Sequence, residues 1–135
     1  SEILATETSA SDLYAIANKL RAGRDGYPRD RKAAQELYLV AAEKGSADAH
    51  FELATMFTTP SSSSERDIDL ADHHFQEAMR LGHPTAVLQL ARLHNNNRPK
   101  SLLWLCRAEK NPATASEAKR SLRIFALIDK MQCAN

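Results

Sequence analysis

Five histidines, together with the carboxylates near them, are the residues of this chain that could bind a metal or move protons. His73 and His74 are adjacent, so on a helix their side chains would point about 100° apart and could not hold one ion together. Asp69 and His73 share a helical face, but no third ligand follows at a compatible spacing, so we expect only a surface contact. The remaining histidines are His50, His83 and His94. These have no patterned acidic partner, so we predict structural or exposed positions, with neither a zinc site nor a catalytic triad.

Nucleotide chemistry and acid–base chemistry are also disfavoured. The chain has only four glycines, too scattered for a phosphate-binding loop or a dinucleotide fingerprint. Carboxylates such as Glu43 and Glu77 lie on predicted solvated helix faces, where no matched acid and base are indicated. We therefore predict no catalytic residues, no metal and no cofactor, in a protein that is not an enzyme.

The two cysteines, Cys106 and Cys133, are too few and too far apart for a metal site or a disulfide framework. The favoured interpretation is two small buried hydrophobic residues, which is a common role of free cysteine. The alternative is a disulfide in an oxidising compartment, provided that the two lie on neighbouring helices. Closing a loop of about 27 residues would then stabilise the C-terminal end by about 3 to 4 kcal/mol.

The composition favours a soluble helical protein. Hydrophobic residues make up 43% and charged residues 26% of the chain, and straight-chain helix formers dominate over β-branched residues. A net charge of +1, from 18 basic and 17 acidic residues, provides no field that would draw the chain to nucleic acid. No apolar run approaches the roughly 20 residues of a membrane span, so we expect no membrane insertion.

The first residues, 1–11, are rich in serine, threonine, alanine and glutamate, and we expect a flexible N-terminal segment. They could be the mature end left by a cleaved signal peptide or simply an arbitrary start. We expect a periplasmic or secreted location, with a cytoplasmic location as the alternative. The sequence does not indicate an oligomeric state.

An internal repeat positions these residues. At an offset of 37 residues three segments align without a gap, with mostly apolar residues at i, i+4, i+5 and i+8, which is one face of a helix. The aligned sets are Asp12, Ala49 and Ala86; Ile16, Leu53 and Leu90; Ala17, Ala54 and Ala91; Leu20, Phe57 and His94. We predict that these segments form the first helix of each repeat.

A second helix follows each first helix. Residues Ala34, Tyr38, Ala41, Ala42 and Gly45 align with Ala71, Phe75, Ala78, Met79 and Gly82 at the same offset. Asp30 and Asp67 stand ahead of these helices, where a carboxylate can accept from free backbone N–H groups, so we predict N-caps. Gly45 and Gly82 stand just past the apolar pattern, so we predict left-handed C-caps.

The third repeat is shorter. Trp104, Ala108 and Asn111 align with Phe75, Met79 and Gly82 at an offset of 29 residues, and we predict a left-handed stop at Asn111 before Pro112. A capping helix over 115–131 should follow, with a polar outer face. The serine-rich stretch from Thr58 to Arg66 is predicted to be an inert solvated loop, and a modified serine tract is the alternative.

These residues resemble the Sel-one-like repeat (SLR) family, the helical-hairpin relatives of the tetratricopeptide repeats. The segment 22–30 is similar to the family's glycine-rich loop before an Asp-headed helix, 38–45 to its aromatic-to-Ala-Ala-x-x-Gly segment, and 49–57 to its first helix. The resemblance covers residues 12 to about 130. It implies an all-α fold, a right-handed α-solenoid of antiparallel helix pairs, in one repeat domain over 12–135 with units of about 12–48, 49–85 and 86–114.

The resemblance also implies where a partner would bind. In such solenoids the first helices line a concave surface, and the family pattern points to one inward, unburied set in each repeat. The predicted partner-binding residues are Tyr14, Asn18 and Arg21; Phe51, Thr55 and Thr58; Leu88, Arg92 and Asn96. The alternative is that Phe51 and Leu88 simply pack against the preceding hairpin.

We therefore predict a non-catalytic adaptor of bacterial type that holds a segment of another protein on its concave face. The alternative is an inhibitor, such as an immunity protein that blocks a toxin or enzyme. The affinity for the partner, and whether the bound partner stays active, would separate the two functions. Catalysis is the third and least favoured interpretation.

Overall fold

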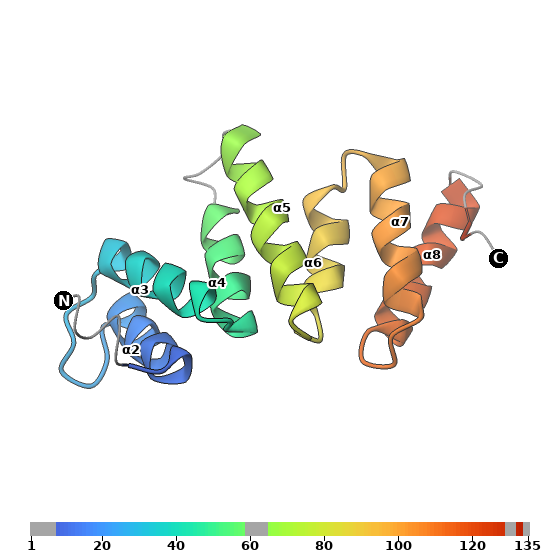
Figure 1. The fold of residues 1–135 in the computed structure, drawn as a ribbon. Helices are drawn as coiled ribbons and strands as arrows, with labels where there is room; N and C mark the ends of the chain where they lie inside the picture. Colours follow the sequence, from blue (N-terminus) through green and yellow to red (C-terminus); the bar gives the residue numbers. More distant parts are fainter. Residues whose placement is uncertain (1–7, 59–64, 129–131, 134–135) are drawn as a thin grey trace. The chain divides into compact units, whose positions relative to one another are not determined.

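The computed structural model describes residues 8–58, 65–128 and 132–133, and all seven regular elements in these ranges are α-helices. The all-α class expected from composition is thereby confirmed for the described residues (Figure 1). The helices are α2 (Ala10–Ala22), α3 (Arg31–Glu43), α4 (Ala47–Phe57), α5 (Glu65–Arg80), α6 (Ala86–Leu93), α7 (Arg98–Glu109) and α8 (Ala115–Ile128). Most of the predicted flexible N-terminal segment, most of the predicted serine-rich loop and the last turn of the predicted capping helix lie outside the described residues.

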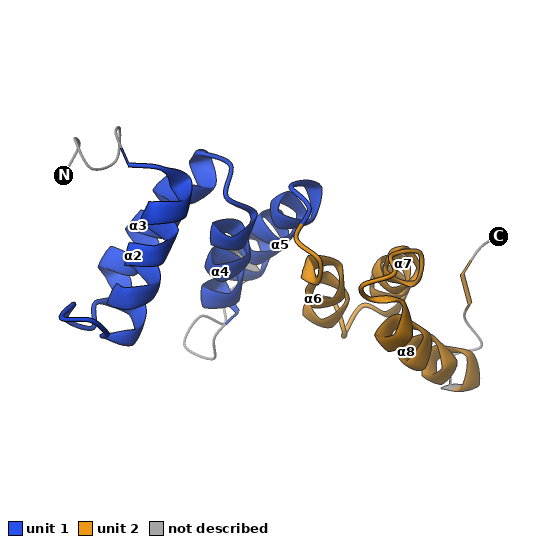
Figure 2. Ribbon diagram, turned by 90° about the horizontal axis from the view of Figure 1, so that it is seen from below, with its two compact units in different colours: residues 1–82 blue, residues 83–135 orange. Residues whose placement is uncertain are grey.

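The chain divides into two compact units, residues 1–82 and 83–135 (Figure 2). Unit 1 holds α2 to α5, and unit 2 holds α6 to α8. The boundary follows Gly82, the residue predicted to end the second helix pair. The single repeat domain predicted over 12–135 stays a prediction.

Within each unit the helices pack as consecutive pairs (Figure 1). In unit 1, α2 packs on α3, α3 on α4, and α4 on α5; in unit 2, α6 packs on α7 and α7 on α8. Each predicted first helix is therefore followed by, and packed against, its predicted second helix. The repeat-like helical architecture agrees with the sequence pattern.

Alanines at the repeat positions allow this close packing. Ala17, Ala34 and Ala49 are completely buried and come from three different helices of unit 1. Side chains this small let helix backbones approach, and larger residues such as Leu13 and Tyr38 fill the remaining space. Trp104, in the shortened third repeat, is 9% exposed, as expected from its alignment with buried Phe75.

Several predicted helix ends are confirmed. The Asp30 carboxylate accepts from the backbone N–H of Ala33 at 3.0 Å and so caps α3. Gly45 and Gly82 have φ angles of +97° and +95°, the left-handed conformation that closes a helix.

Two predicted helix ends are wrong. Asp67 is not an N-cap, because α5 begins two residues earlier, at Glu65, and Asp67 lies in its first turn. Asn111 is not left-handed, since Asp25 is the only described non-glycine residue with a positive φ. The Asn111 side chain instead accepts from the backbone N–H of Ala113 at 3.0 Å, a local bond by which asparagine competes with helix geometry.

Among the helices described, none combines the length and the apolar character that crossing a membrane requires.

Candidate functional site

The nine predicted partner-binding residues lie on or just after the first helices, divided between the two units. Tyr14, Asn18 and Arg21 are on α2, Phe51 and Thr55 on α4, and Leu88 and Arg92 on α6. Thr58 and Asn96 follow the ends of α4 and α6 and are exposed. Unit 1 thus carries six of these residues and unit 2 carries three.

In unit 1 the three residues from α2 meet side chains of α3 and α4. The Arg21 Nη1 donates to Glu52 Oε2, and the guanidinium lies 5.6 Å from the centroid of the Tyr38 ring. The Tyr38 hydroxyl donates to Asn18 Oδ1, and the Tyr14 ring centroid lies 5.8 Å from that of Tyr38. We call these five residues the tyrosine–arginine cluster. It joins three helices through polar groups at the edge of the core.

Burial governs the electrostatics of this cluster. Burial raises the pKa of Tyr38 to about 12, partly opposed by the nearby Arg21 charge. Burial likewise raises the pKa of Tyr14, although its hydrogen bond to the Asn18 side chain acts the other way. Burial alone would lower the pKa of Arg21, but the hydrogen bond and charge of Glu52 outweigh it and raise that pKa. The cluster therefore holds two neutral phenols beside an ion pair at neutral pH.

The α4 residues offer less to a partner. The Phe51 ring packs edge-on against Phe75 of α5, with centroids 5.5 Å apart. The hydroxyl of Thr55 donates to the Phe51 carbonyl at 3.0 Å, and that of Thr58 donates to the Thr55 carbonyl at 2.8 Å. Both hydroxyls are thus bonded to their own backbone. Phe51 therefore packs against the second helix of its own pair, and the alternative of packing against the preceding hairpin stays a prediction.

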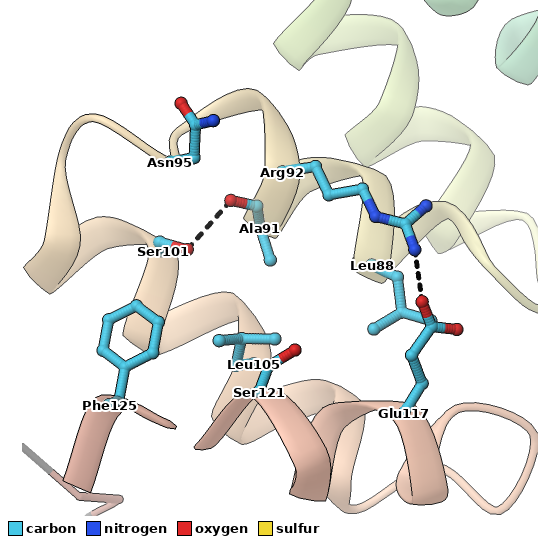
Figure 3. A pocket seen from close by; sticks show the side chains of 9 residues that line it. All are labelled: Leu88, Ala91, Arg92, Asn95, Ser101, Leu105, Glu117, Ser121 and Phe125. Carbon is cyan, nitrogen blue, oxygen red and sulfur yellow. Dashed lines mark hydrogen bonds and ion pairs between the residues drawn. The ribbon is translucent and has the colours of Figure 1, made fainter. Parts of the chain in front are cut away.

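In unit 2 two of the predicted residues, Leu88 and Arg92, line a cavity of about 170 Å³ formed by α6, α7 and α8 (Figure 3). The buried side of the cavity is mainly apolar, and its outer edge carries polar groups. Its lining consists of Leu88, Ala91, Leu105 and Phe125 with Arg92, Asn95, Ser101, Glu117 and Ser121.

The polar groups of this cavity are partly engaged. Arg92 donates to the Glu117 carboxylate of α8, and these side chains are 59% and 46% exposed (Figure 3). The Ser101 hydroxyl donates to the Ala91 carbonyl at 2.9 Å. The cavity can therefore accept an apolar group, with a charged pair beside its mouth.

Leu88 corrects one expectation. It was predicted at an unburied position, but it is only 6% exposed, and it lines the cavity together with residues of α7 and α8. Asn96 is exposed and does not line the cavity.

Sequence reasoning missed several residues of these sites. Glu52 and Glu117 form ion pairs with Arg21 and Arg92, two of the predicted partner-binding residues. Tyr38 was predicted only as a residue of the repeated second helix. His50 of α4 and His74 of α5 meet in the core of unit 1, with Nδ1 atoms 2.9 Å apart. No spacing in the sequence connects these partners, because each pair joins different helices. No group of three or more potential metal ligands gathers among the described residues.

The two cysteines form a disulfide. Cys106 of α7 is joined to Cys133, which follows α8, and their Cα atoms are 5.5 Å apart. Both residues are partly exposed, so the favoured interpretation as two buried free cysteines is wrong. The alternative, a disulfide between these two cysteines, is confirmed, although Cys133 follows α8 and does not lie on a helix.

The chain matches no protein-family model, and a search of curated proteins finds no significant match. The resemblance to the Sel-one-like repeats therefore stays a prediction. It rests on the repeated residues described above.

Proposed function

We propose that this protein is a non-catalytic scaffold that binds a segment of a partner protein along the first helices of its repeats. The proposal includes membership of the Sel-one-like repeat family and a right-handed superhelix of antiparallel helix pairs. The observation that carries it is the cavity in unit 2, because Leu88 and Arg92, two of the residues chosen from the sequence, line it. An apolar cavity edged by polar groups is the usual form of an anchor site in a protein interface.

A recurring contact supports the same role for the first helices. Arg21 of α2 pairs with Glu52 of α4 in unit 1, and Arg92 of α6 pairs with Glu117 of α8 in unit 2. In each unit an arginine of one first helix thus reaches the helix that begins the next pair. These half-exposed ion pairs contribute little stability, but they place exposed hydrogen-bonding groups beside apolar side chains.

The expected ligand is a peptide segment with one large apolar side chain. A cavity of about 170 Å³ can hold a leucine, methionine or phenylalanine side chain. The Arg92 and Glu117 pair could then bond the peptide backbone on either side of that anchor. The disulfide supports a periplasmic or secreted location, since disulfides persist in oxidising compartments.

The experiment is a selection of binding peptides from a random peptide library against the full chain, followed by calorimetry. Ser121→Trp should fill the cavity and weaken binding of the selected peptides by at least about tenfold, and Arg92→Ala should weaken it similarly. Arg120→Trp is the matched control, because Arg120 is exposed on the same helix and does not line the cavity. Circular dichroism checks that all three variants are folded. Peptides that bind equally to Ser121→Trp and Arg120→Trp would contradict this site.

A further inference from the structure

Two histidines meet in the core of unit 1, in a contact that the proposed function does not use. His50 of α4 and His74 of α5 are 9% and 8% exposed, and their Nδ1 atoms lie 2.9 Å apart. The Phe57 ring stacks on His74 with centroids 6.0 Å apart. The two imidazoles therefore bridge α4 and α5 in a place with little access to water.

The contact between the rings and a backbone hydrogen bond of His50 together indicate where the protons lie. Two Nδ1 atoms at hydrogen-bond distance need one proton between them, so one ring must donate and the other accept. His50 also forms a hydrogen bond with the backbone of Ala42 in α3. This bond favours the protonated form of His50, so the His50 ring is the donor. Because Nδ1 of His50 faces His74, the donor to Ala42 is Nε2. A neutral His50 then accepts at Nδ1, and His74 supplies the Nδ1–H.

One further proton cannot be added without a cost. On His50 Nδ1 it would set two N–H groups against each other across 2.9 Å. On the other nitrogen of His74 it would place a charge in a ring that is 8% exposed. The first addition breaks the contact, and the second leaves a charged ring in a buried site, so both make the packed arrangement of α4 and α5 less favourable.

The neighbouring groups act in both directions, and Glu77 gives the largest neighbouring contribution at His50. Burial is the main cause of the lowered pKa of both rings, to about 4 for His74. On α5, His73 and Arg80 oppose a positive charge on His50, and Glu77 favours one. His73 and His50 likewise oppose a charge on His74, and Glu77 again favours it. The α3 contribution is the Ala42 backbone, which favours protonation of His50.

We propose that the His50–His74 pair is an acid-sensitive latch, and that proton uptake by the pair loosens the packing of α4 on α5. The proposal stands independently of the proposed function. Since both pKa values are lowered in the folded state, the stabilisation is complete above the ordinary value of 6.5 and is lost as pH falls toward about 4. Proton uptake by His74 lowers the ratio of folded to unfolded protein by up to about tenfold per pH unit in this window.

The test is hydrogen–deuterium exchange of the full chain at about pH 7 and about pH 5, corrected for the intrinsic pH dependence of exchange. Amides of α4 and α5 should open at least about tenfold more readily at the lower pH, and those of unit 2 should change less. His74→Gln removes the titrating ring and should abolish most of this difference. His73→Gln is the matched control, since His73 is the exposed neighbour on the same helix, and it should keep most of the difference because burial, the main cause, is unchanged.

A measurement on the unmodified chain keeps the proposal testable if His74→Gln folds poorly. Nitrogen-15 NMR of the histidine rings should show His74 carrying its proton on Nδ1 and His50 on Nε2 at neutral pH, with the pKa of His50 below 6.5 and that of His74 near 4. Two Nε2–H rings that titrate near the ordinary value would overturn the latch. So would an acid response in α4 and α5 that is equal in His74→Gln and His73→Gln.

Discussion

At the scale of single residues, Tyr38 shows how one side chain contributes both apolar packing and polar contacts to unit 1. The residue is completely buried, yet its hydroxyl reaches Asn18 and its ring faces the Arg21 guanidinium. A tyrosine in this position contributes apolar area and also a directed polar group. Phe75, the equivalent residue of the second repeat, contributes only apolar area.

The first prediction concerns Tyr38→Phe. Loss of the hydrogen bond to Asn18 should lower the free energy of unfolding by about 0.5 to 1.5 kcal/mol at neutral pH. The pKa of Tyr38 is raised from 10.0 to about 12 in the folded protein, so its stabilising effect is complete below pH 10 and declines as pH rises toward 12. Urea unfolding at about pH 8 and about pH 11 should therefore show a smaller alkaline loss in the variant.

Tyr27→Phe provides the control for this measurement, because Tyr27 lies at the surface with 36% exposure. That variant should keep the alkaline loss of the unmodified protein. If Tyr38→Phe loses as much stability at high pH as Tyr27→Phe does, the assigned pKa is wrong.

Single-residue contacts were the least predictable part of the candidate site. The resemblance placed Tyr14, Asn18 and Arg21 on one helix face, and the structure brings them together. Their partner Glu52 comes from another helix, and helical periodicity describes only one helix at a time. The same holds for His50 and His74, which are 24 residues apart in the sequence and lie on different helices. Contacts of this kind depend on how two helices cross, which no local spacing encodes.

At the scale of elements, the ends of the helices depend on individual backbone positions. Gly23 closes α2 with φ of +69°, and its N–H donates to the Lys19 carbonyl at 2.7 Å. A Cβ at this position would lie 3.1 Å from the Arg29 Cβ. Gly45 also has a positive φ, but a Cβ there would meet open space.

These two glycines allow strain and crowding to be separated. Gly45→Ala should destabilise the protein by about 1 kcal/mol, the cost of a left-handed alanine. Gly23→Ala should cost more, about 1.5 to 3 kcal/mol, because the loop that carries Arg29 must also move. Urea unfolding of both variants measures the difference. Equal losses would show that the loop accommodates the added methyl group freely.

The helices themselves could be predicted because the repeat supplied three aligned copies of the same pattern. The caps at Asp30, Gly45 and Gly82 followed from the same alignment. The predictions for Asp67 and Asn111 were wrong because each residue was given the role of its aligned equivalent. In the structure Asp67 lies inside α5, and Asn111 accepts a hydrogen bond from Ala113. Asp67 in the first turn of α5 still lies near the positive end of the helix dipole, so its residue type fits even though its position was wrong.

At the scale of the whole molecule, the two compact units can be observed separately. The chain has one tryptophan, Trp104, which is in unit 2, whereas its three tyrosines, Tyr14, Tyr27 and Tyr38, are in unit 1. Trp104 is 9% exposed, with the Arg107 guanidinium 5.3 Å from its ring centroid. Its fluorescence should therefore report the unfolding of unit 2, and tyrosine absorbance that of unit 1.

The Cys106–Cys133 disulfide gives the last prediction, because it closes 27 residues entirely inside unit 2. In the chain-entropy model such a loop stabilises the folded state by about 3 to 4 kcal/mol, since the reduced unfolded chain has more conformations. Replacing both cysteines by serine should shift the Trp104 transition to lower urea and leave the tyrosine transition in place. Treating the unmodified protein with a thiol reductant should reproduce that shift, and the serine variant should not respond. If tyrosine and tryptophan signals move together, unit 1 takes its stability from unit 2, and the two units unfold as one.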